Sequence, residues 1–391
     1  MRIAMFSWEA LEGLPVGGGA VYASSLARAM AAQGHYVRLF TRLGGGQTME
    51  DVVRGVRVRR CHWDARRTFI DEIHALCSSF ATHYADTVSA EGPYDVVHCH
   101  EWFTIGAGLR ALASDGRTRL CVSFHSTEWG RTGRWPETGD SAVIANIERR
   151  GVERADAVVA ASNWARRTVA DQFHPPEWKC DVVYHGCELT PLEDPRETMR
   201  RARDAIGVPQ DAPLLLFAGG YSVAGGGDLA ADACRLAAQK YPNALFLFVG
   251  SGGMEAQMRL RAGPNAVFLP PRGRGVPVEY YHAADLVIAP LRRDHHGRAV
   301  LPAWAAAKPV AVLQGSVGAE FVLPGANGWV VADDAAALGE VISDAFGDRR
   351  KTEWMGRNGR VAAETAFGWD QAAQKLLGVY GRRGRLEKMI Q

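Results

Sequence analysis

Short apolar runs alternate with amphipathic stretches along the chain, and this alternation constrains the fold more than any other feature. The apolar runs predict strands at 2–7, 36–41, 94–98, 120–124, 157–161, 181–184, 214–218, 245–249, 266–269, 286–289, 309–313 and 329–331. The stretches between them predict helices, among them 20–33, 69–90, 141–154, 164–172, 228–240, 335–347 and 350–365. Strands that alternate with helices form parallel sheets with helices on both faces. We therefore predict an α/β protein.

The length and a restart of the pattern indicate two domains. The chain has 391 residues, which suits two domains of roughly 190 residues each. The pattern restarts after the polar stretch Glu193–Arg196, so we expect the boundary near residues 186–212. We assign 1–190 to an N-terminal Rossmann-like domain and 191–370 to a C-terminal one. Residues 371–391 are expected to form a helix that returns towards the N-terminal domain.

Composition narrows the class of protein. Lys and Arg number 45 against 43 Asp and Glu, so nothing indicates a nucleic-acid partner. The seven cysteines are scattered singly, which predicts reduced thiols in a cytoplasm and neither a disulfide framework nor a zinc site. No apolar run reaches membrane-spanning length. A predicted strand begins at Arg2, so we expect no signal peptide.

Polar residues follow the predicted strand 120–124. His125, Glu128 and Arg131 come within seven residues of its end, and ligands of open α/β sheets bind at the carboxyl ends of strands. An imidazole, a carboxylate and a guanidinium suit a polyhydroxylated ligand that also carries an anion. For this strand alone, a capped strand end with a surface ion pair is the preferred interpretation, and the glycine loop described next favours a ligand site.

The loop after the first predicted strand carries three glycines. Gly17, Gly18 and Gly19 precede the predicted helix 20–33. Glycines let a backbone approach a ligand closely, and a helix N-terminus favours an anion. A flexible turn would have the same sequence, and no Gly-Lys-Ser/Thr follows that would make it a Walker loop.

The next strand end supplies a second group of polar residues. His98 and His100 flank Cys99, so a regular strand places both on one face. If the strand instead ends between them, one faces the core and the other the cleft. Glu101 is the better candidate for a cleft, because carboxylates are rarely buried unpaired.

Several landmarks in order resemble a known family, the GT-B glycosyltransferases of family 4, in the branch close to glycogen synthases. The resemblance covers nearly the whole chain. Its landmarks are the glycine loop, Asp95–Trp102, His125–Glu128, Ala155–Val159, Tyr184–Gly186, Lys308–Val310 and Phe367–Trp369. The family usually has Asn where this chain has His185.

The resemblance implies a fold and an activity. Two Rossmann-like domains would face each other across a cleft, the N-terminal one holding mainly the acceptor and the C-terminal one the nucleotide sugar. It implies an enzyme that transfers a sugar from a nucleotide diphosphate sugar to a small-molecule or oligosaccharide acceptor, with retention of configuration. No metal and no cofactor is expected, because the nucleotide sugar is a co-substrate.

The resemblance fails at the donor site. Gly220 and Gly225 occupy the positions where the family has the Arg and the Lys that stabilise the departing diphosphate. Asp294 keeps a carboxylate at the first of two family glutamates, but Pro302 replaces the second, which binds the ribose. Two alternatives to a conventional transferase follow. The chain is a catalytically inactive or accessory relative, with a possible protein partner, or it uses an unusual donor or coupling chemistry.

The resemblance also implies a set of site residues. We expect His125 and Asp294 to act in catalysis, with His125 on the transferred sugar. Arg298, then Arg272, are candidates to replace the lost cations, and no covalent nucleophile is nominated. The substrate-binding residues are expected to be Gly17, Gly18, Gly19, Glu101, Glu128, Arg131, Gly219, Gly220, Arg272, His295, His296, Gly297, Arg298 and Ala299.

Overall fold

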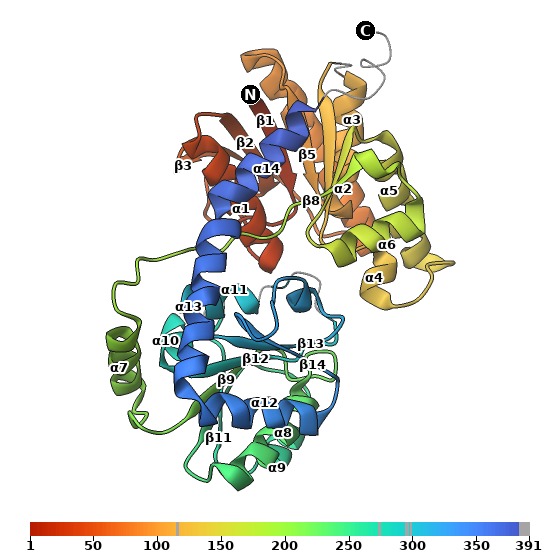
Figure 1. Ribbon diagram of the computed structural model, residues 1–391. Helices are drawn as coiled ribbons and strands as arrows, with labels where there is room; N and C mark the ends of the chain where they lie inside the picture. The colour runs from red at the N-terminus through yellow and green to blue at the C-terminus, as the bar shows by residue number, and fades with distance from the viewer. Residues whose placement is uncertain (115–116, 273–274, 294–296, 298, 383–391) are drawn as a thin grey trace. The chain divides into compact units, whose positions relative to one another are not determined.

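A computed structural model describes residues 1–114, 117–272, 275–293, 297 and 299–382, and each of its two units is built on its own sheet (Figure 1). The first unit contains Met1–Gly186 together with the chain from Trp369 onwards, and the second contains Cys187–Gly368. Both are Rossmann-like, with strands joined through helices. The prediction of a two-domain α/β protein is confirmed.

The first sheet has eight strands in the order β3-β4-β2-β1-β5-β6-β7-β8. All neighbours are parallel except β3 and β4. The strands are β1 (Arg2–Ser7), β2 (Tyr36–Arg42), β3 (Glu50–Val53), β4 (Val56–Cys61), β5 (Val96–His100), β6 (Arg119–Phe124), β7 (Ala157–Ala160) and β8 (Cys180–Val182). The helices are α1 (Gly18–Ala32), α2 (Phe69–Glu91), α3 (Trp102–Ser114), α4 (Glu128–Thr132), α5 (Gly139–Arg154), α6 (Asn163–Phe173) and α14 (Trp369–Gly381), with a 3-10 turn at Glu177–Lys179.

Alternating side chains divide the core of this unit between the two faces of the sheet. Ala4 and Phe6 of β1 pack with α2 and α3, whereas Ile3 and Met5 pack with α1 and α14. Figure 1 shows α14 beside α1. Helix α14 thus completes the cover of the second face, although it lies far away in the sequence.

The second sheet has six parallel strands in the order β11-β10-β9-β12-β13-β14. The strands are β9 (Leu214–Ala218), β10 (Leu245–Val249), β11 (Ala266–Leu269), β12 (Leu286–Ala289), β13 (Val310–Leu313) and β14 (Gly328–Val331). The helices are α7 (Pro195–Ile206), α8 (Gly227–Lys240), α9 (Glu255–Ala262), α10 (Val278–Ala283), α11 (Val300–Ala305), α12 (Ala335–Gly347) and α13 (Arg349–Ala366), with a 3-10 turn at Val317–Glu320. The four central strands, β10, β9, β12 and β13, are nearly all buried, as expected for a sheet covered on both faces. The edge strands β11 and β14 are only partly buried.

A hairpin of two strands and one helix were missed in the sequence prediction. A β3–β4 hairpin was not predicted, because its turn, Arg54–Gly55, lacks the usual Asn-Gly signal and β3 is largely exposed. The polar stretch Glu193–Arg196 begins a helix, because Asp194 caps the amides of Arg196 and Glu197 and Pro195 occupies the first turn.

No helix within the described ranges combines the length and the apolar character that crossing a bilayer requires. All seven cysteines are free thiols, as predicted, and six of them are buried.

Candidate functional site

The glycine loop of the first unit is held by a carboxylate from the same loop. Glu9 accepts hydrogen bonds from the amides of Val16, at 2.9 Å, and Gly17. A Cβ on Gly19 would lie 2.6 Å from the Glu9 Oε1, so a side chain at this position would displace the Glu9 carboxylate. Gly18 is the first residue of α1. The helix N-terminus where an anion was predicted therefore already has an internal carboxylate beside it.

The end of β6 is fixed by Glu101, which follows β5 directly. Glu101 has a left-handed backbone with φ 63°, which is unusual for a residue with a side chain. Its Oε1 accepts the His125 amide at 2.5 Å. Burial raises the pKa of the Glu101 carboxyl, and the Arg131 guanidinium opposes that effect. Glu101 therefore anchors the loop that begins at His125.

A single arginine of this segment, Arg131 in α4, faces three carboxylates from different parts of the unit. Arg131 lies 3.5 Å from Glu101, 3.0 Å from Glu128 and 2.9 Å from Glu148. The two Glu148 oxygens also accept the Glu128 amide, at 2.9 and 3.0 Å, and Ser141 donates to Glu128 at 2.6 Å. The charged residues predicted here hold one another and the loop in place.

Sequence reasoning missed Glu148, which is fully buried on α5. Burial raises its pKa from the ordinary value near 4.5 to about 7, although Arg131 opposes the change. Glu148 lies three residues after Ala145 and four before Val152, so all three share the buried side of an amphipathic helix. This spacing is the one signal in the sequence that indicates an inward-facing carboxylate.

The His125 ring belongs to a buried aromatic cluster. Its Nδ1 lies 3.0 Å from the His185 Nε2. The Tyr22 ring from α1 packs against both imidazoles, with centroids 4.6 Å from His125 and 4.4 Å from His185. His185 and Tyr22 are almost fully buried. The ring of His125 is therefore oriented by α1 and by the segment after β8.

The two histidines of β5 lie on one face of the strand, as predicted. Their rings are 4.2 Å apart. His98 bonds Ser123 at 2.6 Å and the Tyr380 hydroxyl, from α14, at 2.7 Å. Burial lowers the pKa of His98 to about 3 and that of His100 well below its usual value. Both are neutral core residues. Of the three polar residues at the end of β5, Glu101 is the one that bonds the loop beginning at His125.

In the second unit, the loop after β9 has no room for the family's lysine. A Cβ on Gly225 would overlap the carbonyl oxygen of Gly220. Arg292 bonds the Val223 carbonyl and the Asp228 carboxylate, each at 2.7 Å. Its pKa is raised, chiefly by hydrogen bonds to Asp333 and Asp228. Arg292 was not predicted as a site residue, and the two aspartates already balance its charge.

The other predicted donor-site residues are only partly within the described chain. Asp294, His295, His296 and Arg298 lie outside the described residues. Gly297 has a left-handed φ of 62°, and a Cβ there would overlap the Phe321 ring. Ala299 caps α11. Gly219 bonds the Val249 carbonyl through its amide at 3.2 Å, and Gly220 is exposed.

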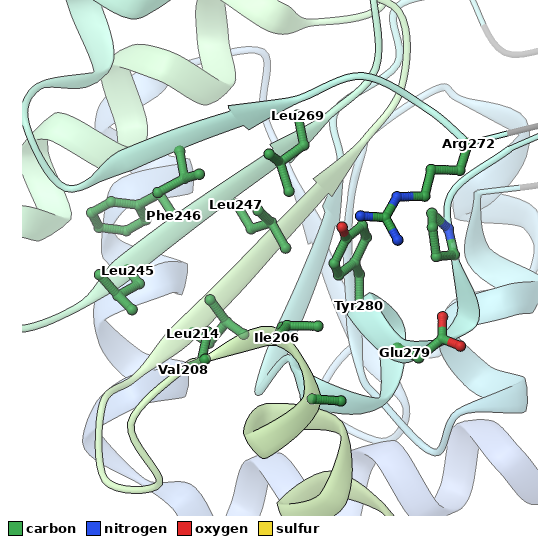
Figure 2. Close-up of a pocket in the computed structure, with 14 residues that line it drawn as sticks. Ile206, Val208, Leu214, Leu245, Phe246, Leu247, Leu269, Arg272, Glu279 and Tyr280 are labelled. Atoms are coloured by element: carbon green, nitrogen blue, oxygen red, sulfur yellow. The ribbon is translucent and has the colours of Figure 1, made fainter.

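Arg272 lines a groove on the second sheet. The groove has a volume of about 640 Å³ and lies between the end of α7, strands β9 to β11 and α10. Figure 2 shows the Arg272 side chain extending towards Tyr280, with Leu247 and Leu269 among the apolar walls. Among the described residues, its lining contains none of the loop 219–226. The guanidinium of Arg272 thus faces this groove.

Two family models match the chain in sequence. Glycosyltransferase Family 4 matches residues 16–190, and Glycosyl transferases group 1 matches residues 198–362. An uncharacterized glycosyltransferase of Methanocaldococcus jannaschii is 27% identical, with 97% of this chain and 98% of that protein covered. D-inositol 3-phosphate glycosyltransferase 1 of Catenulispora acidiphila is 30% identical, with 94% of this chain and 93% of that protein covered.

Solved structures share the whole architecture. Sucrose-phosphate synthase from Thermosynechococcus elongatus matches with a TM-score of 0.77 and 20% identity, and all of both chains is covered. HepE from Anabaena, in complex with UDP and glucose, matches with a TM-score of 0.71 and 17% identity over 98% of this chain and 100% of that one. At these identities, the likeness establishes a common fold.

Proposed function

This chain belongs to the family 4 glycosyltransferases of the GT-B fold, enzymes that transfer glycosyl groups, and we propose that its donor is a nucleotide diphosphate sugar. The acceptor is a small molecule or an oligosaccharide. The bond forms with retention of configuration, and no metal takes part. The relative named for D-inositol 3-phosphate supports a small-molecule acceptor, and the complex of HepE with UDP and glucose supports a nucleotide sugar as the donor.

The fixed position of His125 is the observation that carries the proposal. Its amide is held by Glu101 at 2.5 Å and its ring by His185 at 3.0 Å, at the carboxyl end of β6. A side chain that is already oriented can contact the substrate without first rearranging to reach the transition-state geometry. His125 is the residue that contacts the sugar undergoing transfer, and Glu128 and Arg131 keep its loop in shape.

The second unit binds the nucleotide. Charge develops on the diphosphate as the bond from sugar to phosphate breaks, so a cation or oriented amides must stabilise it. Gly225 leaves no room for a lysine, and Arg292 is already paired. Arg298 is therefore the first candidate for this role, with Asp294 and the amide of Gly297 on the donor.

Product assays with sugars linked to UDP, ADP and GDP test the function. The full chain is expected to transfer from at least one of them, and NMR of the product reports the configuration of the new bond. Replacement of His125 by Ala is expected to abolish transfer, whereas His62→Ala, at an exposed histidine, is the matched control. Wild-type rates in His125→Ala would remove this residue from the site.

Chelation tests the absence of a metal requirement. Rates are expected to be the same with and without EDTA, since protein groups stabilise the leaving diphosphate in this proposal. A complete loss that magnesium or manganese restores would contradict it. An absence of both turnover and nucleotide binding with every donor would instead indicate an inactive or accessory protein.

A further inference from the structure

A small crevice in the second unit is lined by more cations than carboxylates. Its volume is about 40 Å³, larger than the roughly 10–15 Å³ that one water molecule needs. It lies between α7, the residues before β13, and α13. Its charged lining residues are Arg196, Asp285, Lys308, Arg349, Glu353 and Arg357.

The crevice lies at the amino-terminal edge of the second sheet. Asp285 immediately precedes β12, and Lys308 and Pro309 immediately precede β13. Ligands of open α/β sheets bind at the opposite, carboxyl edge, where the loop after β9 lies. The crevice is therefore separate from the proposed nucleotide site.

Lys308 is the buried member of this set. The residue is only 7% exposed, and within the described chain its ammonium has no hydrogen bond or ion pair. Burial lowers its pKa to about 8, so it stays mostly protonated at neutral pH. Asp285 and Glu353 attract the ammonium from beyond ion-pair distance and offset only part of the effect of burial. A buried charge that no hydrogen bond or ion pair compensates is costly, and a bound anion would relieve that cost.

The two carboxylates of the crevice are already matched. Asp285 accepts from Arg203 and from the Leu214 amide, each at 2.8 Å. Glu353 accepts from Arg196 at 2.7 Å. Among the described residues that line the crevice there is no other carboxylate, so nothing there neutralises its remaining cations.

Three cations remain without a counter-ion of their own. Arg349 approaches Asp285 only to 3.6 Å and Glu353 only to 3.9 Å. Arg357 is exposed and, like Lys308, has no ion pair among the described residues. Together these side chains present a buried ammonium and two guanidinium groups to one small space.

We propose that this crevice binds an oxyanion of the phosphate class, either inorganic phosphate or the phosphate group of a monoester. A guanidinium can donate two parallel hydrogen bonds to such a group, and the ammonium acts as a point charge. The anion would join α7, the start of β13 and α13. The site is independent of the proposed transfer reaction.

Calorimetry with inorganic phosphate, on the full chain in chloride buffer at neutral pH, tests the site. Wild type is expected to bind saturably, and Lys308→Met and Arg357→Gln are each expected to weaken binding at least tenfold. Arg350→Gln is the matched control, because Arg350 is exposed on α13 and does not line the crevice. A parallel titration with glycerol 3-phosphate distinguishes the two ligands. A site for a monoester binds glycerol 3-phosphate more tightly than inorganic phosphate, and a site for the free ion does not.

Two outcomes would overturn the proposal. If wild type binds no phosphate, the site does not exist. If Lys308→Met and Arg357→Gln both bind phosphate as wild type does, the ion binds elsewhere and is an adventitious ion only. Thermal unfolding of each variant checks the fold. Arg357→Gln keeps the test decisive if Lys308→Met does not fold, because Arg357 is an exposed side chain.

Discussion

At the scale of single residues, burial determines which groups near His125 change their charge near neutral pH. Glu148 has no exposed surface and must share Arg131 with Glu101 and Glu128. One guanidinium cannot neutralise three carboxylates, so a proton on Glu148 relieves the excess of negative charge. We therefore expect the stability of the loop after β6 to depend on the protonation of Glu148.

Glu148→Gln is expected to change how stability depends on pH. The pKa of Glu148 is about 7 in the folded chain and near 4.5 when exposed. Its contribution to the free energy of unfolding is therefore complete below pH 4.5 and is lost as pH rises through 7. Urea unfolding between pH 5 and 8 should show wild type losing stability relative to the variant as pH rises. Parallel curves would mean that Glu148 does not titrate there.

Replacement of His185 tests whether its ring orients His125. His185→Ala removes the 3.0 Å bond and the packing on Tyr22, so turnover should fall roughly 10- to 100-fold, the range for partners that orient a functional side chain. His185→Asn keeps an amide that can donate to His125 and should recover most of the rate. Equal losses in both variants, with intact circular dichroism, would assign His185 a packing role alone.

At the scale of elements, the sequence predicts the regular parts of the fold well. Strands 2–7, 214–218, 245–249, 266–269 and 286–289 have the predicted bounds, because parallel strands covered by helices are continuous apolar runs. Helix α7 was missed because its signal is the Asp194 cap rather than an apolar pattern. The β3–β4 hairpin was missed because β3 is largely exposed and the turn lacks the usual residues.

The loop between β9 and α8 is expected to reject the lysine that the family carries. In Gly225→Lys, the new Cβ would overlap the Gly220 carbonyl, so the loop must move, and we expect lower stability and weaker nucleotide binding, not a gain in rate. Gly253→Lys is the control, because a Cβ there meets nothing within 4 Å. Thermal unfolding with and without UDP measures both effects. A more active Gly225→Lys enzyme would show that the loop accepts the family arrangement.

At the scale of the whole molecule, the site could be predicted only where its residues are close in sequence. His125, Glu128 and Arg131 were found because they follow one strand. Glu148 and Tyr22 come from other elements, and only the fold brings them to this loop. Partners supplied by distant elements leave no local pattern in a single sequence.

The two units are expected to divide the reaction between them, and two substitutions test this division. His125→Ala, in the first unit, should abolish turnover and leave the affinity for nucleoside diphosphates unchanged. Arg298→Ala, in the second, should lower turnover by roughly 10²-fold and weaken that affinity as well, because it removes a charge from the leaving group. Calorimetry with nucleoside diphosphates and product assays on both variants supply the four measurements. Unchanged binding in Arg298→Ala would exclude Arg298 from the diphosphate site. Weakened binding in His125→Ala would contradict the division, because a residue of the first unit would then contribute to nucleotide binding.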